Sequence, residues 1–178
     1  MPDNIVFMEN KILTSSPNKI MLGIGDIGTS VTPGGVIRTM ALGSCVAVLM
    51  LDRRTRCIGM DHIALPDSSV APDRAKQLPG YFADTGIPAL MQLMKKTVGF
   101  ISKKDLIVKL TGGANVADPN NTFNIGKRNV LAIKKILWGL GLGPVAEDVG
   151  GFHSRTVTLI RDTGKIILSS PGRPDWEI

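Results

Sequence analysis

The chain has 178 residues, of which 43% are apolar and 20% charged, so it can bury the core of one domain. Its two cysteines are too few for a disulfide framework or a thiolate metal site. No apolar run approaches the roughly 18–20 residues that cross a bilayer, and the N-terminus does not resemble a signal peptide. We therefore expect a soluble, cytoplasmic protein without membrane insertion.

The formal net charge is +6, and a basic surface attracts nucleic acid, anionic membranes or acidic proteins. The positive residues form short, separate clusters, and no nucleic-acid-binding motif accompanies them. Aromatic side chains, which stack on bases, make up only 4% of the chain. We expect most of the clusters on solvated turns and helix faces, and an acidic protein partner in preference to nucleic acid.

The first part of the chain is predicted to form strands. Residues 1–18 are interpreted as an N-terminal tail or edge segment ahead of one domain at 19–178. Apolar runs bounded by turn residues predict strands at 19–28, 34–42, 45–52 and 57–65. The third of these strands is apolar on both faces, so we place it deep in the sheet. Residues 67–83 show no periodicity and are predicted to be a loop.

Two amphipathic helices and four more strands follow. A helix is predicted at 84–99, with Asp84 or Thr85 as its cap and Gly99 after its end. The second helix, at 121–141, carries an apolar stripe made of Val130, Ile133, Ile136, Leu137 and Leu140. The remaining strands are predicted at 105–114, 145–151, 154–162 and 164–170. This order predicts a single-domain α/β sandwich with a mixed, largely antiparallel sheet core and two main helices.

A thiol stands where a loop enters the apolar strand at 45–52. If Arg53 and Arg54 are the two turn residues of an antiparallel hairpin, Cys45 faces His62 directly. Their Cβ atoms are then roughly 4.5–5.5 Å apart.

This pairing depends on the length of the turn. With a two-residue turn, Cys57 faces Met50. A turn one or two residues longer moves Cys45 and His62 to a diagonal of about 7–8 Å, which a histidine can still bridge. A one-residue slip puts the two side chains on opposite faces.

Cys45 beside His62 has the residue types of a nucleophile and its base. An imidazole that accepts the thiol proton leaves a nucleophilic thiolate. Thr39 is a candidate for the third group, because its hydroxyl can accept a hydrogen bond from the ring. Backbone N–H groups at the turn before Cys45 can face a developing oxyanion. The alternative is that Cys45 is a buried, inert thiol and His62 an ordinary strand histidine.

The sequence predicts no metal, cofactor or nucleotide site. His62 with Asp61 and Asp67 is a poor metal-binding set, because neighbouring strand residues point to opposite faces. The TGGAN segment at 111–115 lacks the surrounding motif of a phosphate-binding loop. His153 is expected to be a loop residue.

The run TMALGSCVAVLMLDRRTRCIGMDHIALPD at residues 39–67 resembles the signature of the CheD family of bacterial chemoreceptor glutamine deamidases. Further similar segments follow in order and extend the resemblance over roughly residues 20 to 170. They are YFADTGIPAL at 81–90, TGGAN at 111–115, NIGKRN at 124–129, and EDVGG followed by Arg155.

The resemblance implies a fold similar to the catalytic domain of cytotoxic necrotizing factor toxins, and no cofactor. The family's catalytic cysteine, histidine and threonine match Cys45, His62 and Thr39. The implied substrates are glutamines on the cytoplasmic helices of methyl-accepting chemotaxis receptors, converted to glutamate by a thiol mechanism. The implied partner is a CheC-type phosphatase.

Two positions depart from the family pattern. Ala41 stands where the family often has glycine, and Asp61 stands before His62, where a small residue is usual. An acidic side chain that reached the site would favour imidazolium, whereas strand alternation points it away.

Two alternative functions stay open on the sequence. One is a non-catalytic or slow binding module that regulates a CheC-type phosphatase. The other is a receptor glutamyl methylesterase that uses the same residues.

Overall fold

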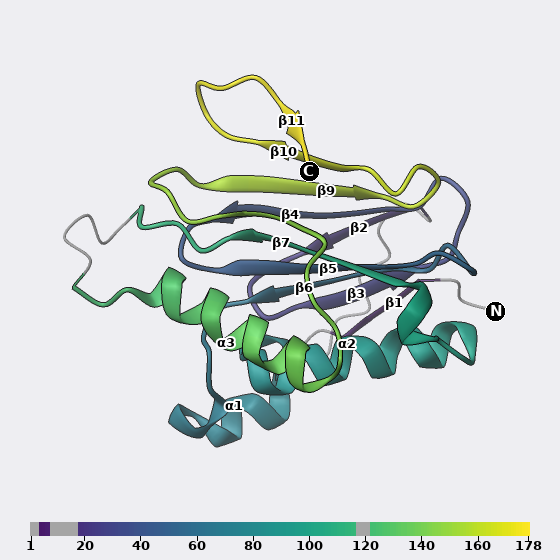
Figure 1. Cartoon of the computed structure of the whole chain (residues 1–178), viewed down its shortest axis with the longest axis horizontal. Coiled ribbons are helices and arrows are strands. Elements are labelled where there is room, and N and C mark those ends of the chain that lie inside the picture. Colours follow the sequence, from purple (N-terminus) through teal and green to yellow (C-terminus); the bar gives the residue numbers. More distant parts are fainter. Residues whose placement is uncertain (1–3, 8–17, 117–121) are drawn as a thin grey trace.

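The computed structural model describes residues 4–7, 18–116 and 122–178. Two β-sheets are stacked face to face, and helices cover the outer face of one of them (Figure 1). Among the described strands, only the pairs β2–β4 and β7–β8 are parallel. The predicted single-domain α/β sandwich, with mixed, largely antiparallel sheets and two main helices, is thereby confirmed.

The first sheet has six strands and the second has five. In spatial order the first contains β1 (Asn4–Phe7), β3 (Ile27–Ser30), β6 (Ile58–Ile63), β5 (Val46–Asp52), β7 (Leu106–Gly112) and β8 (Ala146–Val149). The second contains β11 (Trp176–Glu177), β10 (Ile166–Ser169), β9 (Arg155–Ile160), β4 (Val36–Leu42) and β2 (Lys19–Leu22).

Strand β5 lies in the middle of the first sheet and is buried along its whole length, as its apolar run predicts. Its side chains alternate between two cores. Val46, Val48 and Met50 pack toward the helices, whereas Ala47 and Leu49 pack toward the second sheet. Any group on the second of these faces is enclosed between the sheets.

Helices α2 (Ala83–Val98) and α3 (Ile125–Gly139) cover the outer face of the first sheet (Figure 1). The predicted apolar stripe of α3 is confirmed, with Val130, Ile133 and Leu137 buried against that sheet. Burying each such side chain stabilises the fold by about 1.5–3 kcal/mol. The stripe therefore fixes which face of α3 is turned toward the sheet.

The predicted cap of α2 is wrong, because the helix begins one residue earlier and Phe82 is its N-cap. The side chain of Asp84 instead accepts hydrogen bonds from the backbone N–H and the hydroxyl of Ser68. The hydroxyl of Thr85 donates to the carbonyl oxygen of Pro79 at 2.6 Å. Both side chains therefore bind the segment that precedes the helix, through contacts that the local sequence does not predict. The predicted end at Gly99 is confirmed, with a φ of 81°.

Two predicted segments are divided differently in the structure. The stretch 67–83, predicted to be a loop, contains the short helix α1 (Pro72–Gln77) and two single 3₁₀ turns. Only Ala75 is buried in α1, so the helix leaves no apolar period in the sequence. The stretch predicted as one strand at 19–28 is β2, a tight turn and the start of β3. The carboxylate of Asp26 stabilises this turn by accepting from the N–H of Gly23 at 2.6 Å.

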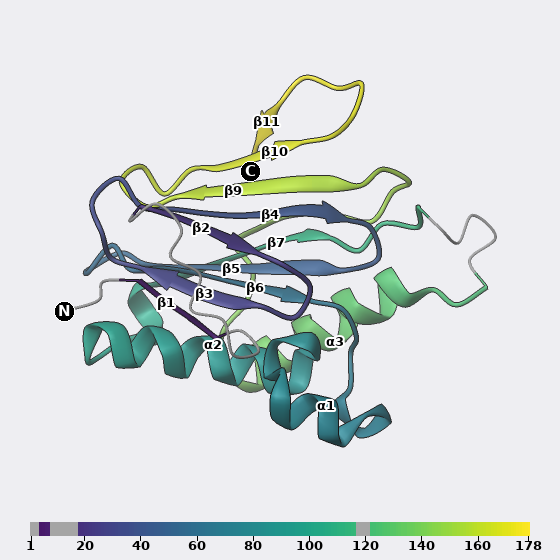
Figure 2. The ribbon, with the colours of Figure 1, turned by 180° about the vertical axis from the view of Figure 1, so that it is seen from behind.

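The ends of the described chain add an edge strand to each sheet. Strand β1 pairs with β3 at the edge of the first sheet (Figure 2). Strand β11, which the sequence did not predict, pairs with β10. Residues 8–17 of the predicted N-terminal segment lie outside the described residues. The division at residue 18 and the likeness to the toxin catalytic domain therefore stay predictions.

Candidate active site

Cys45 and His62 lie on the same face of the first sheet. Ala47 of β5 faces His62 of β6 directly, and Cys45 lies two residues before Ala47. The two side chains therefore occupy a diagonal, for which the separation is typically about 7–8 Å. This face is the one enclosed between the two sheets, and Cys45 packs against its core.

The direct Cys45–His62 pairing predicted for a two-residue turn is wrong, and the diagonal predicted for a longer turn is confirmed. The turn spans residues 53–56, and the N–H of Asp52 donates to the carbonyl of Cys57 at 2.9 Å. Met50 accordingly faces Gly59, not Cys57. The carboxylate of Asp52 stabilises this longer turn by accepting from the hydroxyl of Thr55 at 2.5 Å.

Thr39 reaches the same place from the second sheet. It lies on β4, is fully buried, and its Oγ1 is 2.7 Å from Nδ1 of His62. The Thr39 hydroxyl also donates to the carbonyl oxygen of Leu22, on the neighbouring strand β2, at 2.9 Å. Thr39 and His62, which are 23 residues apart in the sequence, are thus hydrogen-bonded across the sandwich.

These contacts determine the protonation of the His62 ring. The single hydroxyl hydrogen of Thr39 is used on the carbonyl of Leu22, so its oxygen accepts from the ring. Nδ1 of His62 therefore carries the proton, and Nε2 has a free lone pair. Nε2 is buried and has no protein partner among the described residues. The ring presents an unused acceptor, as a general base must.

Burial determines the ionisation of both groups. Burial lowers the pKa of His62 from 6.5 to about 4, so the ring is neutral at pH 7. Burial raises the pKa of Cys45, and the residue's own backbone N–H opposes this by favouring the thiolate. The Cys45 thiol and the His62 imidazole are therefore both neutral at pH 7 in this structure.

The loop before Cys45 is bound by the TGGAN segment. The N–H of Gly113 donates to the carbonyl of Cys45 at 2.8 Å, and that of Ala114 donates to Gly43 at 2.7 Å. Gly112 has a φ of 113°, and a Cβ there would lie 2.3 Å from the Cys45 oxygen. Glycine is needed at this position both for its conformation and for the close approach. The segment therefore holds the backbone of the loop at Gly43 and Cys45.

A cavity of about 520 Å³ opens between this segment and α3. Its lining includes Gly113, Lys127, Leu131 and Gly151.

A family profile described as CheD chemotactic sensory transduction matches residues 64–170. A protein of Syntrophotalea carbinolica, named probable chemoreceptor glutamine deamidase CheD, is 53% identical over 159 residues, which cover 89% of this chain and 98% of that protein. The chain belongs to the CheD family.

Other members of the CheD family match over most of their length. The chemoreceptor glutamine deamidase CheD of Thermotoga maritima is 39% identical over 154 residues, covering 86% of this chain and 93% of that protein. A probable chemoreceptor glutamine deamidase CheD of Syntrophus aciditrophicus is 40% identical over 159 residues, covering 89% and 98%. The profile begins at Ala64, after Thr39, Cys45 and His62, so the assignment of these three residues rests on their sequence motif and geometry.

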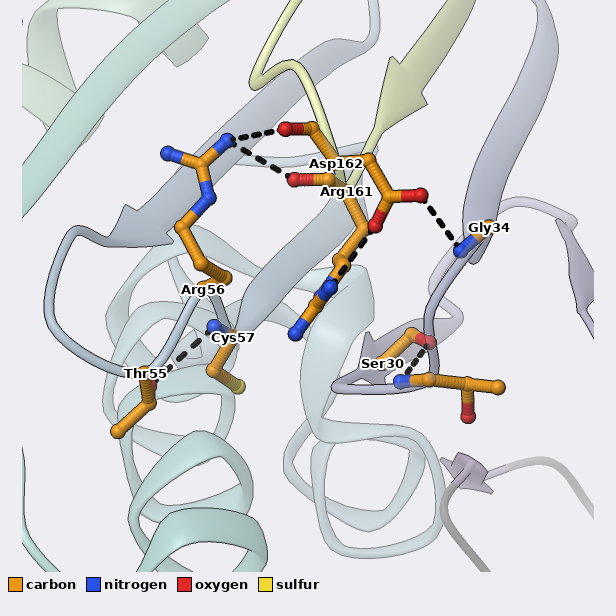
Figure 3. Close-up of polar contacts among 8 residues, drawn as sticks. Ser30, Gly34, Thr55, Arg56, Cys57, Arg161 and Asp162 are labelled. Carbon is orange, nitrogen blue, oxygen red and sulfur yellow. Dashed lines mark hydrogen bonds and ion pairs between the residues drawn. The ribbon is translucent and has the colours of Figure 1, made fainter.

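The second cysteine of this CheD protein is remote from the first. Cys57 lies at the opposite end of β5, roughly 24 Å from Cys45 at about 3.4 Å per strand residue. It is fully buried, and its Sγ is 3.1 Å from the hydroxyl of Thr29. Figure 3 shows it in the hairpin turn, where its N–H donates to Thr55 and the Arg56 side chain binds carbonyls of the β9–β10 turn. Burial raises the pKa of Cys57 to about 11, so it is a structural thiol.

Asp61 points away from the site, as strand alternation predicts. Its carboxylate is fully buried on the helix side of the sheet, where a Cβ on Gly86 of α2 would lie 2.2 Å from it. Burial raises its pKa well above 3.8, and the nearby carboxylate of Asp26 raises it further. No charge on Asp61 contributes to the low pKa of His62.

Three further features of the described residues concern metal-ligating groups, His153 and membrane-spanning helices. The described residues contain no group of three His, Cys, Asp or Glu side chains that could hold a metal ion. His153 lies in the loop before β9, with its ring 6.0 Å from that of Trp176. Within the described ranges, no helix is long and apolar enough to cross a membrane.

Sequence reasoning missed Asn129 of α3. This fully buried residue donates hydrogen bonds to the carbonyls of Ser44 and Ala64, both at 2.9 Å. The available signal was a polar amide next to Val130 and one turn before Ile133, on the apolar stripe of the helix.

Proposed function

We propose that this protein hydrolyses the side-chain amide of particular glutamines on bacterial chemoreceptors, giving glutamate and ammonia. Cys45 is the nucleophile, His62 the general base, and Thr39 the residue that orients His62. Membership of the CheD family and the names of its relatives support the reaction. One observation carries the residue assignment: the bonds of Thr39 to Leu22 and His62 leave Nε2 as an unused acceptor on the face that carries Cys45.

The first half of the reaction forms a thioester. Nε2 of His62 takes the proton of the Cys45 thiol, and the thiolate attacks the amide carbon of the glutamine. The amide oxygen becomes an oxyanion, which accepts a hydrogen bond from the backbone N–H of Cys45. The imidazolium of His62 then gives its proton to the nitrogen, the C–N bond breaks, and ammonia leaves.

The second half restores the thiol. A water molecule gives a proton to His62, and its oxygen attacks the thioester carbon. The C–S bond breaks, the carboxylic acid is released, and the Cys45 thiolate recovers the proton from His62. The sum is amide plus water to acid plus ammonia, so the scheme needs no metal or cofactor.

We place this reaction in the cytoplasm, on the cytoplasmic helices of methyl-accepting receptors, with a CheC-type phosphatase as a regulatory partner. The resemblance of the sequence to the CheD family supports these assignments. The net charge of +6 suits an acidic helical substrate. Contact with nucleic acid and insertion into a membrane form no part of this proposal.

The test uses a cytoplasmic receptor fragment from the same organism, incubated with the wild-type protein or with Cys45→Ala. Peptide mass spectrometry then reads the mass change from amide to acid at each glutamine. We expect conversion at discrete glutamines with the wild type and none with the variant. Conversion at the same sites by folded Cys45→Ala would overturn the assignment of the nucleophile.

The same experiment separates the two alternatives. A methylated fragment that loses methyl groups while its glutamines stay intact identifies a methylesterase. A fragment unchanged by wild-type protein in both forms favours a binding module, which a pull-down of the phosphatase then tests. A pure binding module has no need of a histidine with a fixed tautomer.

A further inference from the structure

One buried amide joins the two halves of the candidate site. Asn129 lies on α3, apart from the loop that carries Cys45 and the strand that carries His62, and is fully buried. Its Nδ2 donates to the carbonyl of Ser44, the residue before Cys45, at 2.9 Å. The same nitrogen donates to the carbonyl of Ala64, two residues after His62, at 2.9 Å.

The chemistry of the partners determines which way the amide faces. Both partners are carbonyl oxygens, which only accept hydrogen bonds, so the NH₂ end of Asn129 must be turned toward them. The Oδ1 atom is buried and has no protein partner among the described residues. The amide therefore acts in this structure through its two donors.

The bond to Ser44 also orients the next peptide group. The carbonyl of Ser44 and the N–H of Cys45 belong to one planar trans peptide and point in opposite directions. Holding this carbonyl toward α3 turns the N–H of Cys45 away from the helix, toward the side on which the thiol lies. The bond to Ala64 attaches the end of the strand that carries His62 to the same nitrogen atom of Asn129.

We propose that Asn129 is a positioning residue, which aligns Cys45 with His62 and directs the backbone N–H of Cys45 toward the oxyanion. The proposal rests on the deamidase mechanism given above. It goes beyond a structural role because both bonds end within two residues of a reacting group.

The side-chain requirement is narrow. Two hydrogen atoms on one nitrogen must reach two carbonyls from a fixed point on α3. Leucine at position 129 has a similar volume and no donor. Aspartate keeps the shape, and between two carbonyls it stays protonated with a single O–H, so it restores one bond of the two.

The test compares Asn129→Leu and Asn129→Asp with Ile133→Ala. Ile133 is fully buried one turn further along α3 and makes no polar contact with the site, so its truncation destabilises the same helix. Two quantities are measured below the unfolding temperature. One is kcat and KM on the receptor fragment, and the other is the rate of alkylation of Cys45 by iodoacetamide against pH, read by peptide mass spectrometry.

We expect Asn129→Leu to lower kcat at least ten-fold, with KM within two-fold, and to move the alkylation profile of Cys45 to higher pH. Asn129→Asp should fall between Asn129→Leu and the wild type. Ile133→Ala should lower the unfolding temperature and leave both readouts unchanged. If Asn129→Leu does not fold, Asn129→Asp alone decides, because it must still lose kcat relative to Ile133→Ala.

Two outcomes overturn the proposal. In one, the Asn129 variants match Ile133→Ala in kcat and in the alkylation profile. In the other, Ile133→Ala loses kcat as they do, which leaves a structural role only. His62→Ala distinguishes failure of the proposed function from failure of the Asn129 role. If His62→Ala leaves the rate of Cys45 alkylation unchanged, His62 does not activate Cys45, and the proposed function is wrong. If His62→Ala slows alkylation and the Asn129 variants do not, only the positioning role fails.

Discussion

The Oγ1 atom of Thr39 and the Nδ1 atom of His62 are 2.7 Å apart, and this bond joins the two sheets of the sandwich. The hydroxyl hydrogen of Thr39 is held by Leu22 on the neighbouring strand. The bond can therefore form in only one direction, with the ring as the donor. In the proposed mechanism Thr39 takes the position that a carboxylate has in other triads, and it adds no charge.

Thr39→Val should lower kcat by about ten- to a hundred-fold, a part of the 10²–10⁴-fold that a positioned general base contributes. Valine keeps the branched shape and removes the acceptor, so the Nδ1 proton of His62 is no longer specified. Steady-state kinetics on the receptor fragment provide the measurement. Thr39→Ser keeps the hydroxyl and should retain most of the activity. Wild-type kcat in Thr39→Val would contradict the orienting role.

Near pH 7.5, iodoacetamide should label Cys45 at least ten times faster than Cys57. Cys45 is partly exposed and lies beside a base, whereas Cys57 is fully buried with a pKa of about 11. Because burial raises the pKa of Cys45 as well, its labelling should increase steadily with pH, with no plateau below pH 7.

His62→Ala provides the control for this labelling experiment. It should slow the labelling of Cys45 and leave that of Cys57 unchanged, because only Cys45 shares a face with the ring. Equal labelling of the two thiols in the wild type would argue against an activated Cys45 and for the binding module.

The free energy of unfolding should depend less on pH in Asp61→Asn than in the wild type. The folded pKa of Asp61 is raised above the usual 3.8, so the folded state binds its proton more tightly than the unfolded state. The stabilisation is complete below pH 3.8 and is lost as pH rises through the folded pKa, at up to about 1.4 kcal/mol per pH unit. Urea unfolding of both proteins at intervals from pH 4.5 to 7.5 tests this, because groups other than Asp61 contribute the same slope to both proteins.

The charge that faces Asp61 is that of Asp26, whose pKa burial also raises. Asp26→Asn is therefore the control, and it should reduce the slope less, because the N–H bond from Gly23 lowers the pKa of Asp26. Equal slopes for Asp61→Asn and the wild type would show that Asp61 is ionised in the folded protein.

Ala41→Gly should stabilise the protein by about 0.5–1 kcal/mol. Ala41 has a φ of 57° in the irregular end of β4, a conformation that costs an L-residue about 1–2 kcal/mol and glycine very little. Glycine also increases the conformational entropy of the unfolded chain, which lowers the free energy of unfolding by about 0.4–1 kcal/mol and offsets part of this gain.

The matched control for this substitution is Ala132→Gly. Ala132 lies within α3, where glycine should cost about 1 kcal/mol. Both variants are compared with the wild type by urea unfolding, and a loss of stability in both would contradict the account of position 41. The left-handed backbone at position 41 gives a physical reason for the glycine that the resemblance to the family leads us to expect there.

Much of the fold was accessible from the sequence because its signals are local. The apolar run at 45–52 predicts a central strand, and the stripe through Val130 and Ile133 predicts which face of α3 is buried. The sequence predicted that Cys45 and His62 lie either directly opposite or on a diagonal, but it could not predict the turn length that decides between the two. The turn at 53–56 is held by tertiary bonds, such as that from the N–H of Arg53 to the carbonyl of Asp105, which no local pattern reveals.

The rest of the site depends on contacts between sheets and on loops. The motif suggested Thr39, yet its bond to His62 and the role of the Leu22 carbonyl require the second sheet to lie over the first. Asn129 was visible as a polar residue on an apolar helix face and as the last residue of the NIGKRN segment, but neither signal identifies its partners. Its two partners, Ser44 and Ala64, are far from it in the sequence.

The most direct test of the central claim compares Cys45→Ser with Cys57→Ser on one receptor fragment, with glutamine-to-glutamate conversion and ammonia release followed together. The account predicts that Cys57→Ser converts the same glutamines as the wild type at a similar rate, with one ammonia per glutamate. It predicts that folded Cys45→Ser converts none above the background. Conversion by Cys45→Ser at the wild-type rate, or its loss only in a folded Cys57→Ser, would contradict the account.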